Sequence, residues 1–359
     1  MAVLSTALPT GYSTALTADK PLLLSKNVLE SGSALDVTAG SGPESISACW
    51  RSVSGVGSAT PINVTGVGAS NSDPWQNPTR IYDRKIYSPA APRLAATTGG
   101  DSFTRHHLIA RIPANSSDDR IDSLVICGHN LAELADYIPT ATLTVTVFLS
   151  DTSSFSSYTQ FAQFVITGAN KTPSRLVHLD SVGYYNVEYV QVVFSVGAGL
   201  EKLPAPQISE IFLGPRRQLS RRPSQETDVL GEEPTSFANI ETENSISTFV
   251  AKSGATTRYA ISRGRELLNP TFAPSGDSEQ STTDLYSMND SATLEQSWVD
   301  SSYGAKPVFY IPYPNSDPNR AYFVYKERQE FNSSVISGLT DREVEYDFRE
   351  IAPYVGSEV

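Results

Sequence analysis

Alternation of apolar and hydroxyl side chains is the feature that most constrains the fold of this chain. In the segment Ala141–Leu149, leucines and valines at every second position alternate with Thr142, Thr144 and Thr146. Successive side chains of a strand point to opposite faces of its sheet, so this pattern predicts a strand with one buried face.

Similar patterns recur from about Trp75 onward and are separated by Gly, Pro, Asn and Asp residues, which favour turns. They predict a mainly β protein with two β-sandwich or jelly-roll-type domains, an extended N-terminal arm and one short helix. The further predicted strands are Leu124–Cys127, Phe161–Thr167, Val187–Val196, Ile208–Leu213, Ile246–Ala251, Arg258–Ser262, Val308–Tyr313, Ala321–Glu327 and Glu343–Phe348.

The predicted helix spans Asn289–Asp300. Asn289 can cap its first turn, and Leu294 and Trp298 are spaced four residues apart on one face. The tyrosine-rich segment Val308–Tyr325 is interpreted as core on two adjacent strands joined by a turn. Exposed tyrosines of this kind would instead mark an interface or a sugar platform.

The domain boundary is predicted where an apolar strand ends in a basic connector. In Gln207–Ser224, Gly214 and Pro215 stop the strand, and four arginines follow: Arg216, Arg217, Arg221 and Arg222. We predict an arm at 1–20, a first domain at 21–218, a linker at 219–240 and a second domain at 241–359.

Charge is divided unevenly between the two predicted domains. Residues 1–224 are neutral overall, and the whole excess of 12 negative charges lies in residues 225–359. We therefore expect no nucleic-acid partner, because such a partner requires a net basic face. The four arginines are interpreted as interface candidates that pair with acidic groups of another domain or subunit, ahead of contact with phosphate.

The sequence contains no recognised catalytic, nucleotide-binding or metal-binding motif, so we predict no catalytic residues, cofactor or metal. The histidines are interpreted as ordinary side chains, and acidic pairs such as Asp118 and Asp119 as solvated turns. Cys127 is expected to be a buried free thiol, although pairing with Cys49 stays open. The N-terminus predicts no signal peptide, and no apolar run approaches the roughly 20 residues of a membrane span.

Two tracts resemble components of bacteriophage tails. The segments Lys26–Ser52, Ile121–Leu131, Thr144–Asp151 and Tyr189–Gly214 resemble a galactose-binding-like (discoidin-type) jelly roll, as found in phage tail proteins. Residues 240–359 look like the C-terminal β domain of tail or baseplate proteins, through the segments Thr256–Phe272, Gly304–Pro314 and Arg342–Val355 and the short helix that bears Trp298.

This resemblance implies a virion structural protein of the tail, tail tip or baseplate, without catalytic activity and assembled in the host bacterial cytoplasm. Its expected partners are other tail proteins and copies of itself in a symmetric ring. The alternative is a receptor-binding module that recognises host surface glycan. A third class, a capsule-degrading enzyme, requires carboxylates clustered in one cleft.

Overall fold

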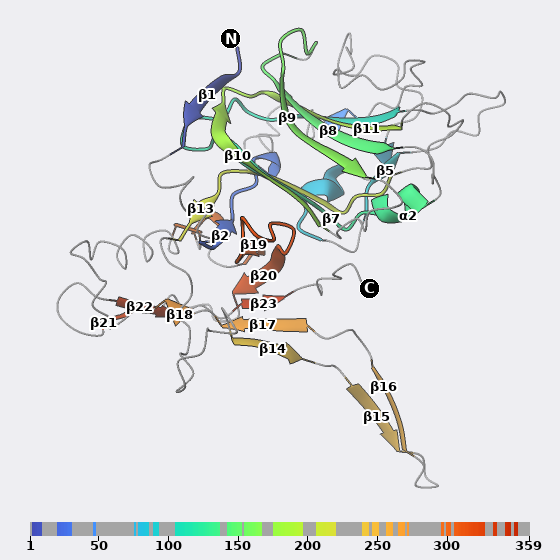
Figure 1. Ribbon diagram of the computed structural model, residues 1–359, viewed down its shortest axis with the longest axis vertical. Coiled ribbons are helices and arrows are strands. Elements are labelled where there is room, and N and C mark those ends of the chain that lie inside the picture. Colours follow the sequence, from blue (N-terminus) through green and yellow to red (C-terminus); the bar gives the residue numbers. More distant parts are fainter. Residues whose placement is uncertain are drawn as a thin grey trace, which may run out of the picture. The chain divides into compact units, whose positions relative to one another are not determined.

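The computed structural model confirms the prediction of a mainly β protein (Figure 1). The chain divides into two compact units, one built from Met1–Thr10 and Lys26–Arg216 and the other from Gly11–Ser25 and Arg217–Val355. The structure describes residues 2–8, 20–30, 46–47, 75–76, 78–85, 89–92, 105–136, 142–152, 154–166, 175–196, 206–219, 239–243, 246–250, 256–260, 265–269, 271–272, 296–297, 299–302, 305–326, 333–335, 342–345 and 348–350.

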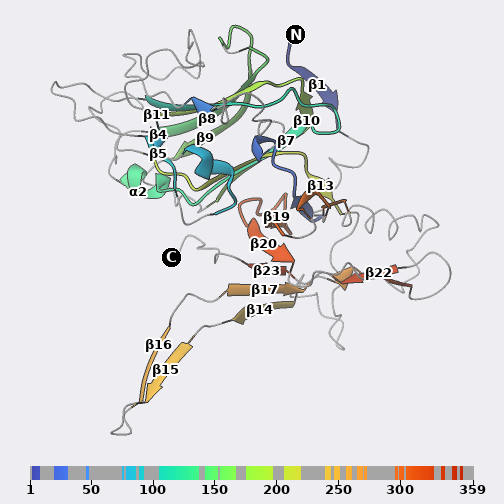
Figure 2. The same cartoon turned by 180° about the vertical axis from the view of Figure 1, so that it is seen from behind.

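The first unit is a β-sandwich of two antiparallel sheets, seen from opposite sides in Figures 1 and 2. One sheet has the order β1-β10-β7-β12, with bounds Leu4–Ala7, Arg175–Tyr185, Ile121–Cys127 and Glu210–Gly214. The other has the order β3-β6-β11-β8-β9, with bounds Ile46–Ser47, Arg105–Arg111, Tyr189–Val196, Leu143–Ser150 and Thr159–Ile166.

Alternating side chains of both sheets form the core of the sandwich. Val145 and Val147 of β8 are fully buried, as the alternation predicts, and they belong to one hydrophobic cluster with Leu124 and Ile126 of β7. The prediction that only one face of β8 is buried is wrong, because Thr146 and Phe148 on its other face are also buried. Short elements complete the unit: η1 (Val28–Glu30), β4 (Trp75–Gln76), η2 (Pro78–Tyr82), β5 (Ala91–Pro92) and α2 (Leu131–Asp136). No helix in the described part of the chain is long and apolar enough to cross a membrane.

The second unit is built around a seven-stranded antiparallel sheet of order β13-β2-β19-β20-β23-β17-β14. These strands span Arg217–Gln218, Leu22–Leu24, Val308–Ile311, Tyr322–Lys326, Phe348–Glu350, Arg265–Asn269 and Asn239–Glu243. Two smaller sheets pair β15 (Ile246–Val250) with β16 (Thr256–Ala260), and β22 (Arg342–Glu345) with both β18 (Thr271–Phe272) and β21 (Ser333–Val335).

The tyrosine-rich segment forms core, as predicted. Tyr310 of β19 and Tyr322 of β20 lie opposite each other in the sheet and are 0% and 1% exposed. Burial, followed by the nearby tyrosines, raises the pKa of the Tyr310 hydroxyl. The large rings therefore fill the interior of the second unit.

The units do not follow the predicted boundaries at every point. The arm predicted at 1–20 contributes β1 to the first unit, and β2, which follows it, belongs to the sheet of the second unit. The predicted linker begins at 219, where the backbone N–H of Leu219 still donates to the carbonyl of Pro21 in the second unit. Residues 296, 297, 299 and 300 of the predicted helix are helical, and its earlier residues lie outside the described part.

Candidate functional site

The structure places the first two predicted interface arginines in different units. Arg216 ends the Lys26–Arg216 segment of the first unit and is fully buried. Arg217 belongs to the second unit, where its side chain is 28% exposed and its Nη2 lies 3.1 Å from Asp300 Oδ2. Arg221 and Arg222 lie outside the described residues. The four arginines are therefore not one exposed patch, because Arg216 has no accessible surface.

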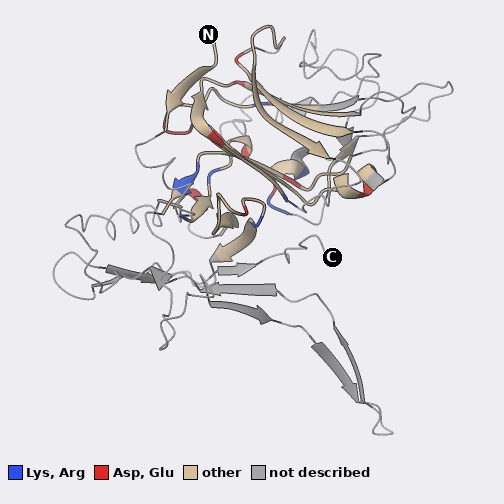
Figure 3. Cartoon of the chain, viewed as in Figure 1, with Lys and Arg blue, Asp and Glu red and all other residues tan. Residues whose placement is uncertain are grey.

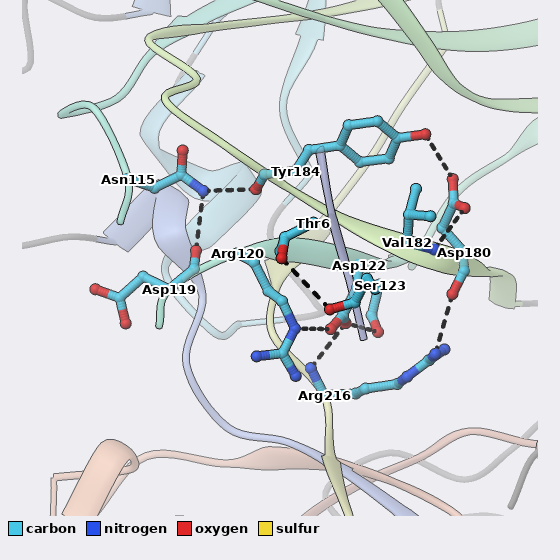
Figure 4. Close-up of polar contacts among 11 residues, drawn as sticks. Thr6, Asn115, Asp119, Arg120, Asp122, Ser123, Asp180, Val182, Tyr184 and Arg216 are labelled. Carbon is cyan, nitrogen blue, oxygen red and sulfur yellow. Dashed lines mark hydrogen bonds and ion pairs between the residues drawn. The ribbon is translucent and has the colours of Figure 1, made fainter. Parts of the chain in front are cut away.

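Arg216 connects the end of β12 to two neighbouring strands of its sheet (Figure 4). Its backbone N–H donates to Asp122 Oδ1 of β7 at 2.9 Å, and its Nη2 donates to the carbonyl oxygen of Asp180 in β10 at 3.0 Å. One residue thus links three strands at the point where the chain leaves the first unit.

Asp122 is the anionic centre of this network. Besides the Arg216 N–H, its carboxylate accepts from Arg120 Nε at 3.0 Å and from Ser123 Oγ at 2.7 Å. Burial raises the pKa of Asp122 above its usual value, and the guanidinium groups of Arg216 and Arg120 oppose that rise. A buried carboxylate surrounded by donors in this way fastens the structure rather than accepting a substrate.

Asp180 begins an irregular segment of β10, where pairing with β7 shifts between Leu179 and Tyr184. Its Oδ1 accepts from the Val182 N–H at 3.2 Å, and its Oδ2 accepts from the Tyr184 hydroxyl at 3.3 Å (Figure 4). Burial acts to raise the pKa of Asp180, but contacts with His178 and with backbone N–H groups outweigh it and lower the pKa. The carboxylate therefore holds the bulge against which β1 pairs.

A second buried acid, Glu210, lies at the start of β12. Its Oε2 accepts from the backbone N–H of Arg84 at 2.9 Å, and its Oε1 accepts from Asn27 Nδ2 at 3.3 Å. The Arg84 side chain contacts Glu30 and lies over the Phe212 ring at 5.8 Å. Burial, reinforced by the charge of Glu30 and opposed by Arg84, raises the pKa of Glu210 well above its usual value.

Glu210 also ends a row of three buried residues on adjacent strands. Arg175 of β10 and Glu210 of β12 each lie opposite Cys127 of β7. The next position on each strand, such as Ile126, belongs to the sandwich core, so the row points to the other face of the sheet. Cys127 is a buried free thiol, as predicted, and burial followed by the charge of Glu210 raises its pKa. It is therefore a poor nucleophile.

Asn27 closes the outer edge of β12. Its Oδ1 accepts from the Leu213 N–H at 3.2 Å, and its Nδ2 donates to the Ile211 carbonyl at 2.9 Å. Gly214 allows this approach, because a Cβ there would collide with the backbone carbonyl of Lys26. The amide side chain thus supplies the bonds that another strand would make.

Sequence reasoning missed the buried acids, although a signal for them exists. Asp122 lies in the sequence IDSLVIC and Glu210 in SEIFLG, where a single acid interrupts an apolar strand. Figure 3 shows acidic residues as isolated red segments on ribbons of the first unit that are otherwise mostly tan. In a strand buried on both faces, such a residue must find partners. The partners themselves, such as Arg84 and Asn27, are distant in sequence and carry no signal of this kind.

The histidines were predicted to be ordinary side chains, and the structure places three of them besides His178. His129 Nδ1 accepts from the Leu131 N–H at 3.4 Å at the start of α2, and burial lowers the pKa of His129 to about 4. Adjacent His106 and His107 lie in β6. Within the described ranges, no group of three or more His, Cys, Asp or Glu residues is arranged to hold a metal ion.

Comparison with models of known protein families and with curated proteins found no match to this chain.

Proposed function

We propose that this chain is a virion structural protein of a bacteriophage, in the tail, tail tip or baseplate, and that it acts by subunit assembly without catalysis. The proposed class of protein rests on the two tracts of the sequence that resemble phage tail proteins. They cover most of the sequence, and both predict β domains of the kind that virion components use as scaffolds.

The observation that carries the proposal is how the first unit uses its buried ionisable groups. Asp122 and Glu210 bind arginine side chains, amides and backbone N–H groups of other segments of the same unit. Arg216 ties the last strand of that unit to its neighbours just before the chain enters the second unit. These buried hydrogen bonds and ion pairs connect segments of the first unit to one another. They suit a structural component that must keep its folded shape within an assembly.

The proposed partners are other tail proteins and copies of this chain in a symmetric ring, and the proposed site of assembly is the host bacterial cytoplasm. Mass spectrometry of purified virions, followed by gold-labelled antibody imaging, tests the location. We expect the chain in whole particles at a fixed ratio to other tail proteins, with label on the tail. Recovery of the chain only in the particle-free fraction would refute the proposal.

A second candidate function is recognition of host surface glycan. The loop between β8 and β9 exposes 41% of Tyr158, whose ring lies edge-on to Phe148 with centroids 5.5 Å apart. Hydroxyls of Thr152, Ser154 and Ser156 lie within 3.5 Å of one another in the same loop. An exposed aromatic ring beside hydroxyl groups is a combination that can bind a sugar.

A glycan array probed with the full chain tests this candidate. Replacing Tyr158 with Ala should abolish any signal, whereas the control Val299→Ala, at a residue 42% exposed in the other unit, should leave it unchanged. The absence of signal for the unsubstituted protein at high concentration, or equal signal for both variants, excludes this loop as the sugar site.

A further inference from the structure

Strand β9 forms one edge of the five-stranded sheet, beside β8 (Figure 1). On its other side, no strand from the described part of the chain pairs with it. An edge strand presents a row of backbone N–H and C=O groups, which can pair with another chain unless the protein blocks them.

The two sheets of the first unit have three other edge strands, β12, β3 and β1, and each is protected in a way that β9 lacks. Asn27 occupies the edge of β12, while β3 has only two residues and β1 only four. By contrast, β9 is eight residues long, and its sequence TQFAQFVI contains no charge, proline or glycine. Val165, on this strand, is 59% exposed, the highest value among the exposed large apolar residues of the described chain.

A bulge divides β9 into two halves. The register with β8 shifts between Val147 and Phe148, which places Phe161 at the irregularity. Phe161 turns inward, and its ring packs edge-on against His178 and Tyr184 of the opposite sheet at 5.1 and 5.7 Å. The regular half of the strand is therefore Ala162–Ile166.

Within this regular half, the two faces have separate characters. Gln163 and Val165 are exposed on the outer face, opposite Thr146 and Thr144 of β8. Phe164 and Ile166 point inward; Phe164 packs partly buried against the sandwich core, and Ile166 is part of it. A strand added here in register would continue both the uncharged outer surface and the apolar inner layer.

We propose that the occupant of this edge is β9 of a second copy of the chain, paired antiparallel about a two-fold axis at Phe164. In this register, Phe164 lies opposite its own equivalent, Ala162 lies opposite Ile166, and Gln163 lies opposite Val165. All opposite pairs then lie on the same face, as an isologous contact requires. The two five-stranded sheets become one continuous sheet across the contact.

Charge is compatible with a copy of this chain as the occupant. The excess of 12 negative charges lies in residues 225–359, whereas residues 1–224, which include β9, are neutral overall, so two copies can meet through an uncharged surface of this unit. The regular half of β9 is such a surface, and self-pairing places no like charges opposite each other. This inference rests on the proposed function in so far as assembly requires contacts between copies, and it specifies one of them.

A charge-swap experiment tests this contact. One variant carries Gln163→Lys with Val165→Lys, and another carries Gln163→Glu with Val165→Glu; both positions are exposed, so the fold should tolerate them. In the proposed register each substituted side chain lies opposite one like charge on the partner, which makes two like-charge pairs per dimer. Each variant alone should self-associate about tenfold more weakly than the unsubstituted chain, and their mixture should restore the dimer.

Sedimentation velocity over a concentration series measures these outcomes, with circular dichroism as the check on folding. The matched control, Leu4→Lys with Ala7→Lys, adds the same charge at the β1 edge and should leave the dimer unchanged. An unsubstituted chain that stays monomeric at the highest concentration would overturn the inference. So would a lysine variant that dimerises as well as the unsubstituted chain, or a mixture that does not associate.

The same variants separate this inference from the proposed tail function. If the mixture dimerises but purified virions lack the chain, the β9 contact stands and the tail role fails. If virions contain the chain but the isolated protein is monomeric, the tail role stands and the β9 contact is overturned.

Discussion

Replacing Arg216 with Met should destabilise the first unit by about 3–5 kcal/mol at pH 7, the range for removing one partner of a buried charge network. Met keeps much of the aliphatic volume but removes the donor to the Asp180 carbonyl at 3.0 Å, and a bond from a charged donor contributes about 1.5–3 kcal/mol. The rest comes from Asp122, whose buried carboxylate loses the guanidinium that most strongly opposes the effect of burial on its pKa, although the backbone N–H of residue 216 remains.

The destabilisation should depend on pH with a definite sign. Without the guanidinium, the folded-state pKa of Asp122 rises further above its unfolded value of about 3.9. The extra cost of ionising buried Asp122 is therefore absent at pH values below its unfolded-state pKa. This cost grows as the pH rises through the folded-state pKa of Asp122. The loss of stability should be greater at pH 7 than at about pH 4.

Hydrogen exchange followed by mass spectrometry gives the opening free energies of β7, β10 and β12 within the first unit, so it does not require two-state unfolding of the whole chain. The matched control is Arg217→Met, which removes a pair with Asp300 in the second unit and should change the opening free energies of β7, β10 and β12 by less than about 1 kcal/mol. A loss below about 1 kcal/mol for Arg216→Met, or a loss independent of pH, would refute the reasoning. Additivity with Asp122→Asn would also refute it, since residues of one network should couple.

Three further changes test other contacts of the first unit by chemical denaturation. Because the folded-state pKa of Glu210 is raised, ionising this buried carboxyl costs stability that grows above about pH 4.5, and Glu210→Gln should remove this cost. Relative to the unsubstituted chain, the variant should therefore gain stability as pH rises. A stability difference that is unchanged from pH 5 to 8 would contradict this. Gly214→Ala should cost about 1–3 kcal/mol, because its methyl group meets the fixed carbonyl of Lys26, and a neutral effect would show that the backbone there yields. Asn27→Ala should cost about 2–4 kcal/mol by leaving the Leu213 N–H and the Ile211 carbonyl unpaired, and fast exchange of the Leu213 amide should accompany the loss.

The parts of the fold that are local in sequence could be predicted, and the parts that depend on distant contacts could not. Alternation located β8 within two residues at each end because its period is set by strand geometry alone. It gave no indication that β2, a run of three leucines, joins the sheet of the second unit, because three apolar residues carry no period. Strand β10 was not predicted for a related reason: its bulge after Leu179 breaks the alternation of apolar and polar side chains.

The same distinction explains the candidate site. Arg216 was predicted as an interface residue because it lies in a cluster of four arginines. The whole cluster was interpreted as one exposed interface. Burial depends on where β12 ends relative to Asp122 and Asp180, which lie 94 and 36 residues away. Adjacent residues of a connector can thus have opposite roles: Arg216 completes the interior of one unit, and Arg217 is partly exposed in the next.

This division of roles bears on how the chain could work in an assembly. A connector anchored at Arg216 fixes where the chain leaves the first unit, because two of its bonds hold the exit to β7 and β10. The proposed β9 contact uses the other sheet of the sandwich, and the polar network lies in the sheet that contains β12. Substitutions in β9 should therefore change association without changing the protection of β12, and Arg216→Met should reduce the protection of β12 before it alters association. Observation of both effects in one variant of either kind would show that the two sheets do not act independently.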